Sequence, residues 1–231
     1  MKRYSILSLD FDYFPVVTSD LISKCYPDPL DLSPQLSELV WASKYAQFSE
    51  ELLQIEVNME EISIAKQILS RQNKEIPVMI ALSHVSIYNF IHQLQQGGKP
   101  LNIVNADTHH DYFNDNPQVD CGNWLSFIME EYPKSKWEWV VNPISLDTYD
   151  AHELQPYVKE SLKELENRQF DAIFLCRSDN WSPPHLDTAF FDLVRQLKSF
   201  QTVEIQRGLC IRKQWVKDTQ QIKRIENMKG T

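Results

Sequence analysis

The stretch LNIVNADTHHD, residues 101–111, joins a short apolar run to three acidic or imidazole side chains at alternate positions. In extended backbone, residues two apart point to the same side, so Asp107, His109 and Asp111 can converge on one point. The apolar run that precedes them has the length of a buried strand. This stretch therefore predicts a strand of a buried sheet that ends in a cluster of polar side chains.

Short apolar runs of the same kind alternate with amphipathic segments along the rest of the chain. The other expected strands are Tyr4–Leu9, Ile76–Leu82, Trp137–Val141, Phe170–Cys176 and Thr202–Ile205. Apolar residues recur at helical spacing at Val158, Leu162 and Leu165 and at Phe190, Val194 and Leu197. Residues 37–71 are helical in composition and contain no Pro or Gly, but Val57 and Asn58 suggest a break inside them. This alternation is typical of helices packed over a mostly parallel sheet, so the expected fold class is α/β.

Length and composition favour one soluble globular unit. The chain has 231 residues, and we expect a single domain over 1–231 with a polar tail from about Arg212. Its net charge of -9 disfavours a nucleic-acid partner. We expect no export signal, because Asp10 and Asp12 interrupt the first apolar stretch, and no membrane span, because no run of ~18 apolar residues occurs. The four scattered cysteines form no CxxC pair, which fits a reduced, cytoplasmic location.

Two further polar groups follow apolar runs. Asp10 and Asp12 close the first run, and His84 follows the run that begins at Pro77. In an open α/β sheet, ligands collect beyond the carboxyl ends of the strands, where all these side chains should lie. An Asp pair can instead cap a loop, and a lone histidine is often a core or loop residue. The DxHxD cluster is more specific, because nothing structural requires three such groups on one side of a strand end.

Together these side chains predict a site for two divalent cations. Four carboxylates in one place would repel one another unless cations neutralised them. Oxygen-rich ligands with some imidazole favour two Mn²⁺ ions over structural zinc. Two such ions generate a nucleophile from water at neutral pH, so we expect a metal-dependent hydrolase. The expected metal ligands are Asp10, Asp12, His84, Asp107, His109 and Asp111.

These motifs resemble those of a known enzyme family. DTHHD at 107–111 resembles the DxHxD motif of arginases and other ureohydrolases, and LSH at 82–84 resembles their first-histidine segment. SLDFD at 8–12 is similar to their second aspartate pair, which in ordinary arginases comes late in the chain. This order, together with RSDNWSP at 177–183, resembles the divergent peptide arginases, which convert arginine side chains of ribosomally made peptides to ornithine.

The resemblance implies a fold, a substrate and a role for each metal ligand. The fold would be a three-layer arginase-like one, with the metals at the carboxyl ends of the strands. Asp10 and Asp107 would bridge two manganese ions; His84 and Asp111 would complete one ion, and His109 and Asp12 the other. The partner would be an arginine-containing precursor peptide, and the products would be urea and peptidyl ornithine.

Further residues are expected around the substrate. Asn123 and Trp124 resemble the Gly-Asn loop that contacts substrate in arginases, although the same residues could simply begin a helix. Asp179 could bind the guanidinium, or cap the turn before Pro183. His110 is the nearest substitute for the histidine proton carrier of arginases, which has no equivalent here. No clear counterpart of the loops that bind the α-amino and α-carboxylate groups of free arginine can be found.

The motifs are also compatible with different functions. A haloacid-dehalogenase-like phosphatase begins with a strand and DxD too, and would use Asp10 as nucleophile with one Mg²⁺. That class leaves His84 and the DxHxD cluster unexplained. An arginase-fold deacetylase with one zinc ion, a small-molecule ureohydrolase and a non-catalytic metal-binding or peptide-binding module also remain open.

Overall fold

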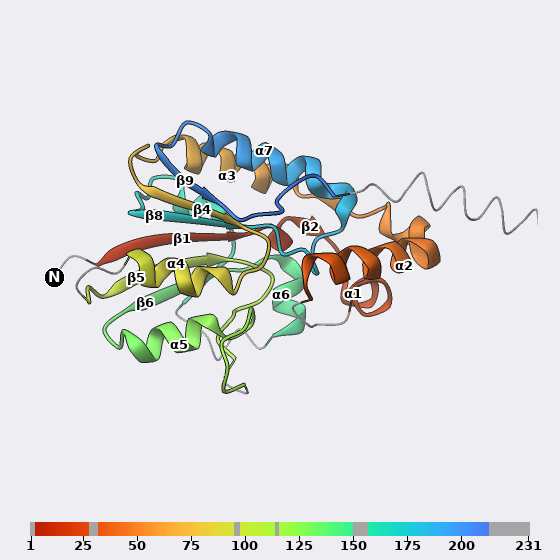
Figure 1. Ribbon diagram of the computed structural model, residues 1–231, viewed down its shortest axis with the longest axis horizontal. Helices are drawn as coiled ribbons and strands as arrows, with labels where there is room; N and C mark the ends of the chain where they lie inside the picture. The colour runs from red at the N-terminus through yellow and green to blue at the C-terminus, as the bar shows by residue number, and fades with distance from the viewer. Residues whose placement is uncertain (1–2, 28–31, 95–97, 114–115, 150–156, 213–231) are drawn as a thin grey trace, which may run out of the picture.

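The computed structural model describes residues 3–27, 32–94, 98–113, 116–149 and 157–212, so the expected polar tail lies almost wholly outside the described residues. In this part of the chain, a seven-stranded parallel sheet has the order β7-β6-β5-β1-β8-β4-β9 (Figure 1). Its strands are β1 (Tyr4–Asp10), β4 (Pro77–Ala81), β5 (Leu101–Ala106), β6 (Lys136–Val140), β7 (Val158–Lys159), β8 (Ala172–Cys176) and β9 (Thr202–Ile205). The predicted α/β class is confirmed.

Helices and short segments connect these strands. The α-helices are α1 (Ser19–Cys25), α2 (Pro34–Leu52), α3 (Met59–Ser70), α4 (Ser86–Leu94), α5 (Trp124–Glu131), α6 (Pro143–Thr148) and α7 (Asp187–Leu197). Three 3-10 helices, η1 (Phe11–Tyr13), η2 (Leu162–Leu165) and η3 (Pro184–Leu186), and a small hairpin of β2 (Pro15–Val16) and β3 (Glu56–Val57) complete the described elements. The predicted break is confirmed, because β3 and the capping residue Asn58 separate α2 from α3.

Helices cover both faces of the sheet, which explains why its inner strands are apolar almost throughout. On one face, Leu7 and Leu9 of β1 belong to the core that also includes α3 and α7; on the other, Ile6 packs with α4 and α5. Figure 1 shows these two helical layers on opposite sides of the strands. Side chains alternate along a strand, so Ser8 and Asp10 point to the same face as Ile6.

The expectation of a helix through Val158, Leu162 and Leu165 is wrong. Val158 belongs to β7, which pairs with β6, and only Leu162–Leu165 form a short 3-10 helix. Glu61 of α3 explains the difference, because it accepts hydrogen bonds from the Ser161 hydroxyl at 2.7 Å and the Leu162 N–H at 3.2 Å. Tertiary contacts therefore decide the structure of this segment. The same apolar spacing is compatible with an extended segment followed by a tight turn.

Candidate metal centre

The candidate site lies at the carboxyl ends of four neighbouring strands, β5, β1, β8 and β4. Asp10 is the last residue of β1, Asp107 directly follows β5, and His84 lies three residues beyond β4. Ser178 follows β8 at the same edge. Parallel pairing therefore brings together residues that are far apart in the sequence, as the motifs predict.

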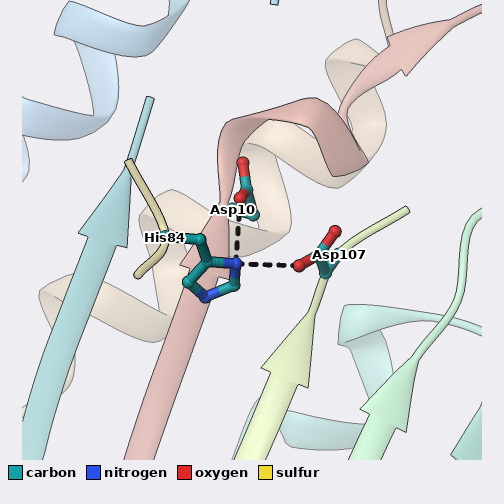
Figure 2. A group of neighbouring side chains, drawn as sticks. All are labelled: Asp10, His84 and Asp107. Carbon is teal, nitrogen blue, oxygen red and sulfur yellow. Dashed lines mark ion pairs between the residues drawn. The ribbon is translucent and has the colours of Figure 1, made fainter. Parts of the chain in front are cut away.

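His84 is the centre of the first group of potential ligands. Its Nδ1 atom lies 2.9 Å from Oδ2 of Asp107 and 3.0 Å from Oδ2 of Asp10, and Figure 2 shows both carboxylates turned toward it. Oδ2 of Asp111 is also 3.0 Å away. The four side chains are buried, yet within the described part of the chain Nδ1 of His84 has no hydrogen-bond partner.

The spacing of these atoms fits a shared cation. One imidazole nitrogen cannot hydrogen-bond to three carboxylates at once, since it carries at most one hydrogen. Adjacent ligands of an octahedral ion, each ~2.1 Å from the metal, lie about 3.0 Å apart. The contacts around Nδ1 of His84 match that separation, so the residues present fit a metal ion.

A second group adjoins the first and shares Asp107 with it. Nδ1 of His109 lies 3.1 Å from Oδ2 of Asp12 and 3.4 Å from Oδ1 of Asp107. Oδ2 of Asp12 is buried and has no hydrogen-bond partner among the described residues. Asp107 thus presents one oxygen to each group. Asp10 faces the first group through Oδ2, while its Oδ1 accepts the N–H of Asp12 at 3.1 Å.

Hydrogen-bond donors and acceptors outside the cluster orient the ligands. Ser8 Oγ lies 2.7 Å from Nε2 of His84, and a hydrogen on Nε2 leaves the lone pair of Nδ1 free for a metal. The Trp124 indole N–H donates to Oδ2 of Asp111 at 2.7 Å, and the Ser178 hydroxyl donates to Oδ2 of Asp10 at 2.5 Å. Partners of this kind are a regular feature of protein metal sites.

Thr108 joins the DxHxD loop to the end of β1. Its N–H donates to Oδ1 of Asp12 at 3.2 Å, and its hydroxyl donates to the Asp12 carbonyl at 2.8 Å. The Asn142 side chain donates to the same hydroxyl at 2.7 Å. These contacts within the protein therefore fix the two aspartate-bearing segments to each other.

Two residues of the site adopt a backbone conformation that non-glycine residues rarely use. Asp111 has φ of 55° and Ser178 has φ of 50°. The left-handed region costs a residue with a side chain about 1–2 kcal/mol. Such residues persist only where surrounding contacts hold them, and they gather at functional sites.

The electrostatics of the cluster also fit cation binding. Burial, together with the charges of Asp10 and Asp107, raises the pKa of Asp12 well above its usual range. Burial and Asp107 raise the pKa of Asp111 to about 8. Burial by itself lowers the pKa of His84, but the carboxylates around it raise that pKa well above its usual range. The buried carboxylates therefore favour positive charge beside them, which divalent cations would supply.

A cavity of about 520 Å³ opens over the cluster. It is lined by Asp10, His84, Asp107, His109, Asp111, Phe113, Asn116, Asp120, Cys121, Gly122, Tyr149, Ser178 and Trp181. Trp181 lines the cavity, and its ring centroid lies 4.5 Å from that of His109. No lysine or arginine occurs among the described residues of the lining, so the cavity has an acidic and aromatic wall.

Two of the expected substrate-binding residues lie elsewhere. Asn123 is fully buried, and its side chain accepts the N–H of Asp120 at 2.8 Å and donates to the Gln118 carbonyl at 2.9 Å. Trp124 is also fully buried, against His84, and bonds to Asp111. Asn123 directly precedes α5 and organises the loop before it, whereas Trp124 is the first residue of α5 and orients a candidate metal ligand. Neither lines the cavity.

The carboxylate of Asp179 has a partner within the protein. Arg177 donates to it from Nε at 2.5 Å and from a terminal nitrogen at 3.1 Å. Asp179 is buried and does not line the cavity, so its position does not favour the expected role as a guanidinium ligand.

His110 lies outside the cavity lining as well. It is buried among Phe113, Trp139 and Tyr149, and its Nδ1 accepts the N–H of Tyr112 at 3.0 Å. Burial and the neighbouring charge of His109 lower the pKa of His110 to about 4. This position does not favour the expected proton transfer near neutral pH.

The structure adds residues that the sequence motifs did not indicate. Ser8 and Ser178 contact candidate ligands, while Asp120 and Tyr149 line the cavity. Ser8 could have been found from strand alternation, because it lies two residues before Asp10. Ser178 stands in the RSDNWSP motif, but the motif gives it no role, because its hydroxyl meets Asp10 only through the pairing of β8 with β1.

No family model, curated protein or solved structure matches the chain. Its class is therefore defined by geometry: a parallel α/β protein with a buried carboxylate and imidazole cluster that could hold metal ions. Among the described helices, none combines the length and the apolar character that a membrane crossing requires.

Proposed function

We propose that this protein is a hydrolase with two divalent cations that converts arginine within a peptide to ornithine and urea. The observation that carries the proposal is the convergence of three carboxylate oxygens on Nδ1 of His84, with Asp107 shared by a second group at His109. One carboxylate facing two ligand groups is the arrangement that a pair of adjacent cations needs.

The metal ligands divide into two sets under this proposal. Asp10, His84, Asp107 and Asp111 would hold one cation, and Asp12, Asp107 and His109 the other. Oxygen-rich sets with one imidazole each favour Mn²⁺ or a similar ion. When bound, two such cations supply a water-derived nucleophile at neutral pH and offset the carboxylate charge.

The overall reaction needs no other reactant than water. Water adds its oxygen to the guanidinium carbon, and the bond from that carbon to the side-chain nitrogen breaks. The two protons of the water end on the departing nitrogen, so a guanidinium cation and water become an ammonium cation and neutral urea. The overall charge is unchanged. The side chains of the cavity would have to orient the guanidinium with its carbon beside the candidate cation sites.

The cavity lining supports a cationic, planar substrate group. Trp181 and Tyr149 offer aromatic faces, which attract guanidinium ions. Asp120 adds a carboxylate that accepts hydrogen bonds from the Gly122 N–H and the Asn116 side chain, and is thereby held on the wall. These residues lie beside the metal cluster, where a guanidinium carbon would have to be placed.

The same lining favours arginine within a peptide over free arginine. The α-carboxylate of free arginine needs a cationic or hydrogen-bonding partner when it leaves water. Among the described lining residues no lysine or arginine offers one. An arginine within a peptide carries amide groups in place of the charged α-amino and α-carboxylate groups of free arginine.

The test measures urea and peptide mass after Mn²⁺-loaded protein is incubated separately with an arginine-containing peptide and with free arginine. We expect urea from the peptide, a matching conversion of arginine to ornithine in its mass, and little reaction with free arginine. D107N serves as the control for trace enzymes. Efficient hydrolysis of free arginine with an unchanged peptide would contradict the substrate assignment.

A parallel arm tests the phosphatase alternative. A phosphate ester with Mg²⁺ should not be hydrolysed, and no phosphoryl group should be trapped on Asp10. Both oxygens of Asp10 already accept hydrogen bonds, from Ser178 and from the Asp12 N–H. Phosphoryl transfer to Asp10 would overturn the proposed reaction class.

A further inference from the structure

Four buried charged residues form a network beside the metal centre. Arg177 and Asp187 are at most 1% exposed, and Asp179 and Arg212 are below 10%. Arg177 contacts both aspartates: it donates twice to Asp179, and its terminal nitrogen lies 3.2 Å from Oδ2 of Asp187. Arg212 donates to Oδ1 of Asp187 from a terminal nitrogen at 2.6 Å and to Oδ2 from its backbone N–H at 2.7 Å.

This network lies on the far side of the β8 end from the metal centre. Ile173 and Leu175 of β8 belong to the core with α7, whereas Phe174 and Cys176 belong to the core with α4 and α5. Continued alternation directs Arg177 toward α7 and Ser178 toward the site. Accordingly Arg177 meets Asp187 at the start of α7, and Ser178 lines the cavity.

The backbone on both sides of Ser178 is held by hydrogen bonds. Before it, the N–H of Arg177 donates to the Ala81 carbonyl at 3.0 Å. After it, the Asp179 carbonyl accepts from Ser37 at 3.0 Å, from Trp41 at 2.7 Å and from Arg212 at 2.9 Å. Three donors on this carbonyl oxygen fix the peptide bond between Asp179 and Asn180, one residue beyond Ser178.

Ser178 needs this support because of its conformation. Its φ of 50° is unfavourable for a residue with a side chain, so surrounding contacts must maintain it. In that conformation its hydroxyl donates to Oδ2 of Asp10 at 2.5 Å, the same oxygen that faces His84.

We propose that Arg212 is a positioning residue for the metal centre, which acts through Asp179 and Asp187 to hold the Ser178 hydroxyl on Asp10. The inference rests on the metal site of the proposed function, and it does not depend on which bond is hydrolysed. It assigns a role in metal binding to a residue 34 positions after Ser178 in the chain.

The experiment is a double-mutant cycle on Mn²⁺ binding, measured by titration calorimetry and by the electron paramagnetic resonance of bound Mn²⁺. We expect S178A and R212M each to weaken Mn²⁺ binding about 10-fold, as is usual when a partner of a metal ligand is lost. If Arg212 acts through Ser178, R212M should cost no further affinity in the S178A background. Additive losses would mean that Arg212 acts by another route, and would overturn the inference.

A matched control removes another paired arginine. Arg168 donates to both oxygens of Glu138 at 3.0 Å and 2.6 Å, and it precedes β8, at the opposite end of that strand from Ser178. R168M should leave Mn²⁺ affinity within about 2-fold of the unmodified protein. A loss equal to that of R212M would show a general effect of stability and count against the inference.

Two more variants cover the case in which R212M does not fold. D187N/R212M removes one buried charge of each sign, which proteins tolerate better than one unpaired charge. R212K keeps the charge but loses the planar fork, so it should restore only part of the affinity. Full Mn²⁺ affinity in a folded D187N/R212M protein would overturn the inference. Absence of Mn²⁺ binding in the unmodified protein would instead overturn the proposed function.

Discussion

Asp107 lies 2.9 Å from Nδ1 of His84 through one carboxylate oxygen, and its other oxygen faces away from that histidine toward the second ligand group. This division makes Asp107 the residue common to both candidate cation sites. Its pKa reflects the same geometry: although burial raises it, the adjacent His109 and His84 side chains lower it well below the usual range.

The first prediction concerns this shared carboxylate. D107N should remove the charge common to both sites and reduce activity and Mn²⁺ content strongly, by more than the about 10- to 100-fold typical of residues that only orient a ligand. Metal analysis and circular dichroism should show loss of metal with a retained fold. D20N, a change at an exposed position of α1, is the control. Two bound ions and full turnover in D107N would contradict the shared role.

The second prediction concerns the indole that holds Asp111. W124F keeps an aromatic ring but removes the N–H that donates to Oδ2 of Asp111 at 2.7 Å. Mn²⁺ affinity should fall about 10-fold, because Asp111 loses its orienting partner. W137F is the control, since that ring packs between Tyr112 and Tyr157. Unchanged affinity in W124F would mean that this hydrogen bond does not orient the metal ligand.

The third prediction concerns stability. A cation that binds only the folded state at 100 times its dissociation constant adds about 2.7 kcal/mol to the free energy of unfolding. For a chain of this size that amount should raise the melting temperature by about 5–11 °C. Differential scanning calorimetry with Mn²⁺, and again after a chelator, measures the shift. D107N should show little or none of it; an equal shift in D107N would place the binding outside the candidate site.

The fourth prediction concerns the substrate and rests on the proposed function. D120N should raise KM for the peptide about 10-fold with little change in kcat, because it removes a charged partner for the cationic side chain. Steady-state urea release gives both constants, with D20N again as the control. A fall in kcat at unchanged KM would mean that Asp120 acts in the chemical step and not in binding.

The fifth prediction concerns pH and an ion pair far from the cavity. Arg168 and Lys159 lower the pKa of Glu138 in the folded protein, against the opposing effect of burial. Because the pKa of Glu138 is lowered in the folded protein, its ionised carboxylate stabilises the fold at pH values above the ordinary glutamate pKa. This stabilisation is lost as the pH falls. E138Q should therefore lower the free energy of unfolding by about 0.5–1 kcal/mol at pH 7, a range that allows for the partial exposure of Arg168. In acid the loss should be smaller. Urea unfolding of both proteins at pH 7 and in acid measures this loss. A difference in unfolding free energy that is the same at the two pH values would exclude the ionic contribution.

Local sequence determined the secondary structure of the sheet and most of the candidate cluster. Its apolar runs are long enough to be buried strands, and the side chains that end them are of the types that bind cations. Strand alternation predicts that Asp107, His109 and Asp111 lie near one another, but β5 ends at Ala106 and Asp111 has φ of 55°, so a loop and not an extended strand carries them. These properties depend on neighbours within about ten residues, so the sequence alone is enough to predict them.

Only the tertiary structure decided which polar residues face the cavity. Asp179 and Asp120 are both aspartates in polar segments, yet Asp179 is paired with Arg177 and Asp120 lines the cavity. Trp124 and Ser178 reach candidate ligands through α5 packing and strand pairing. The roles of these residues depend on partners that are distant in the chain, and such partners become neighbours only when the parallel strands and their covering helices pack together.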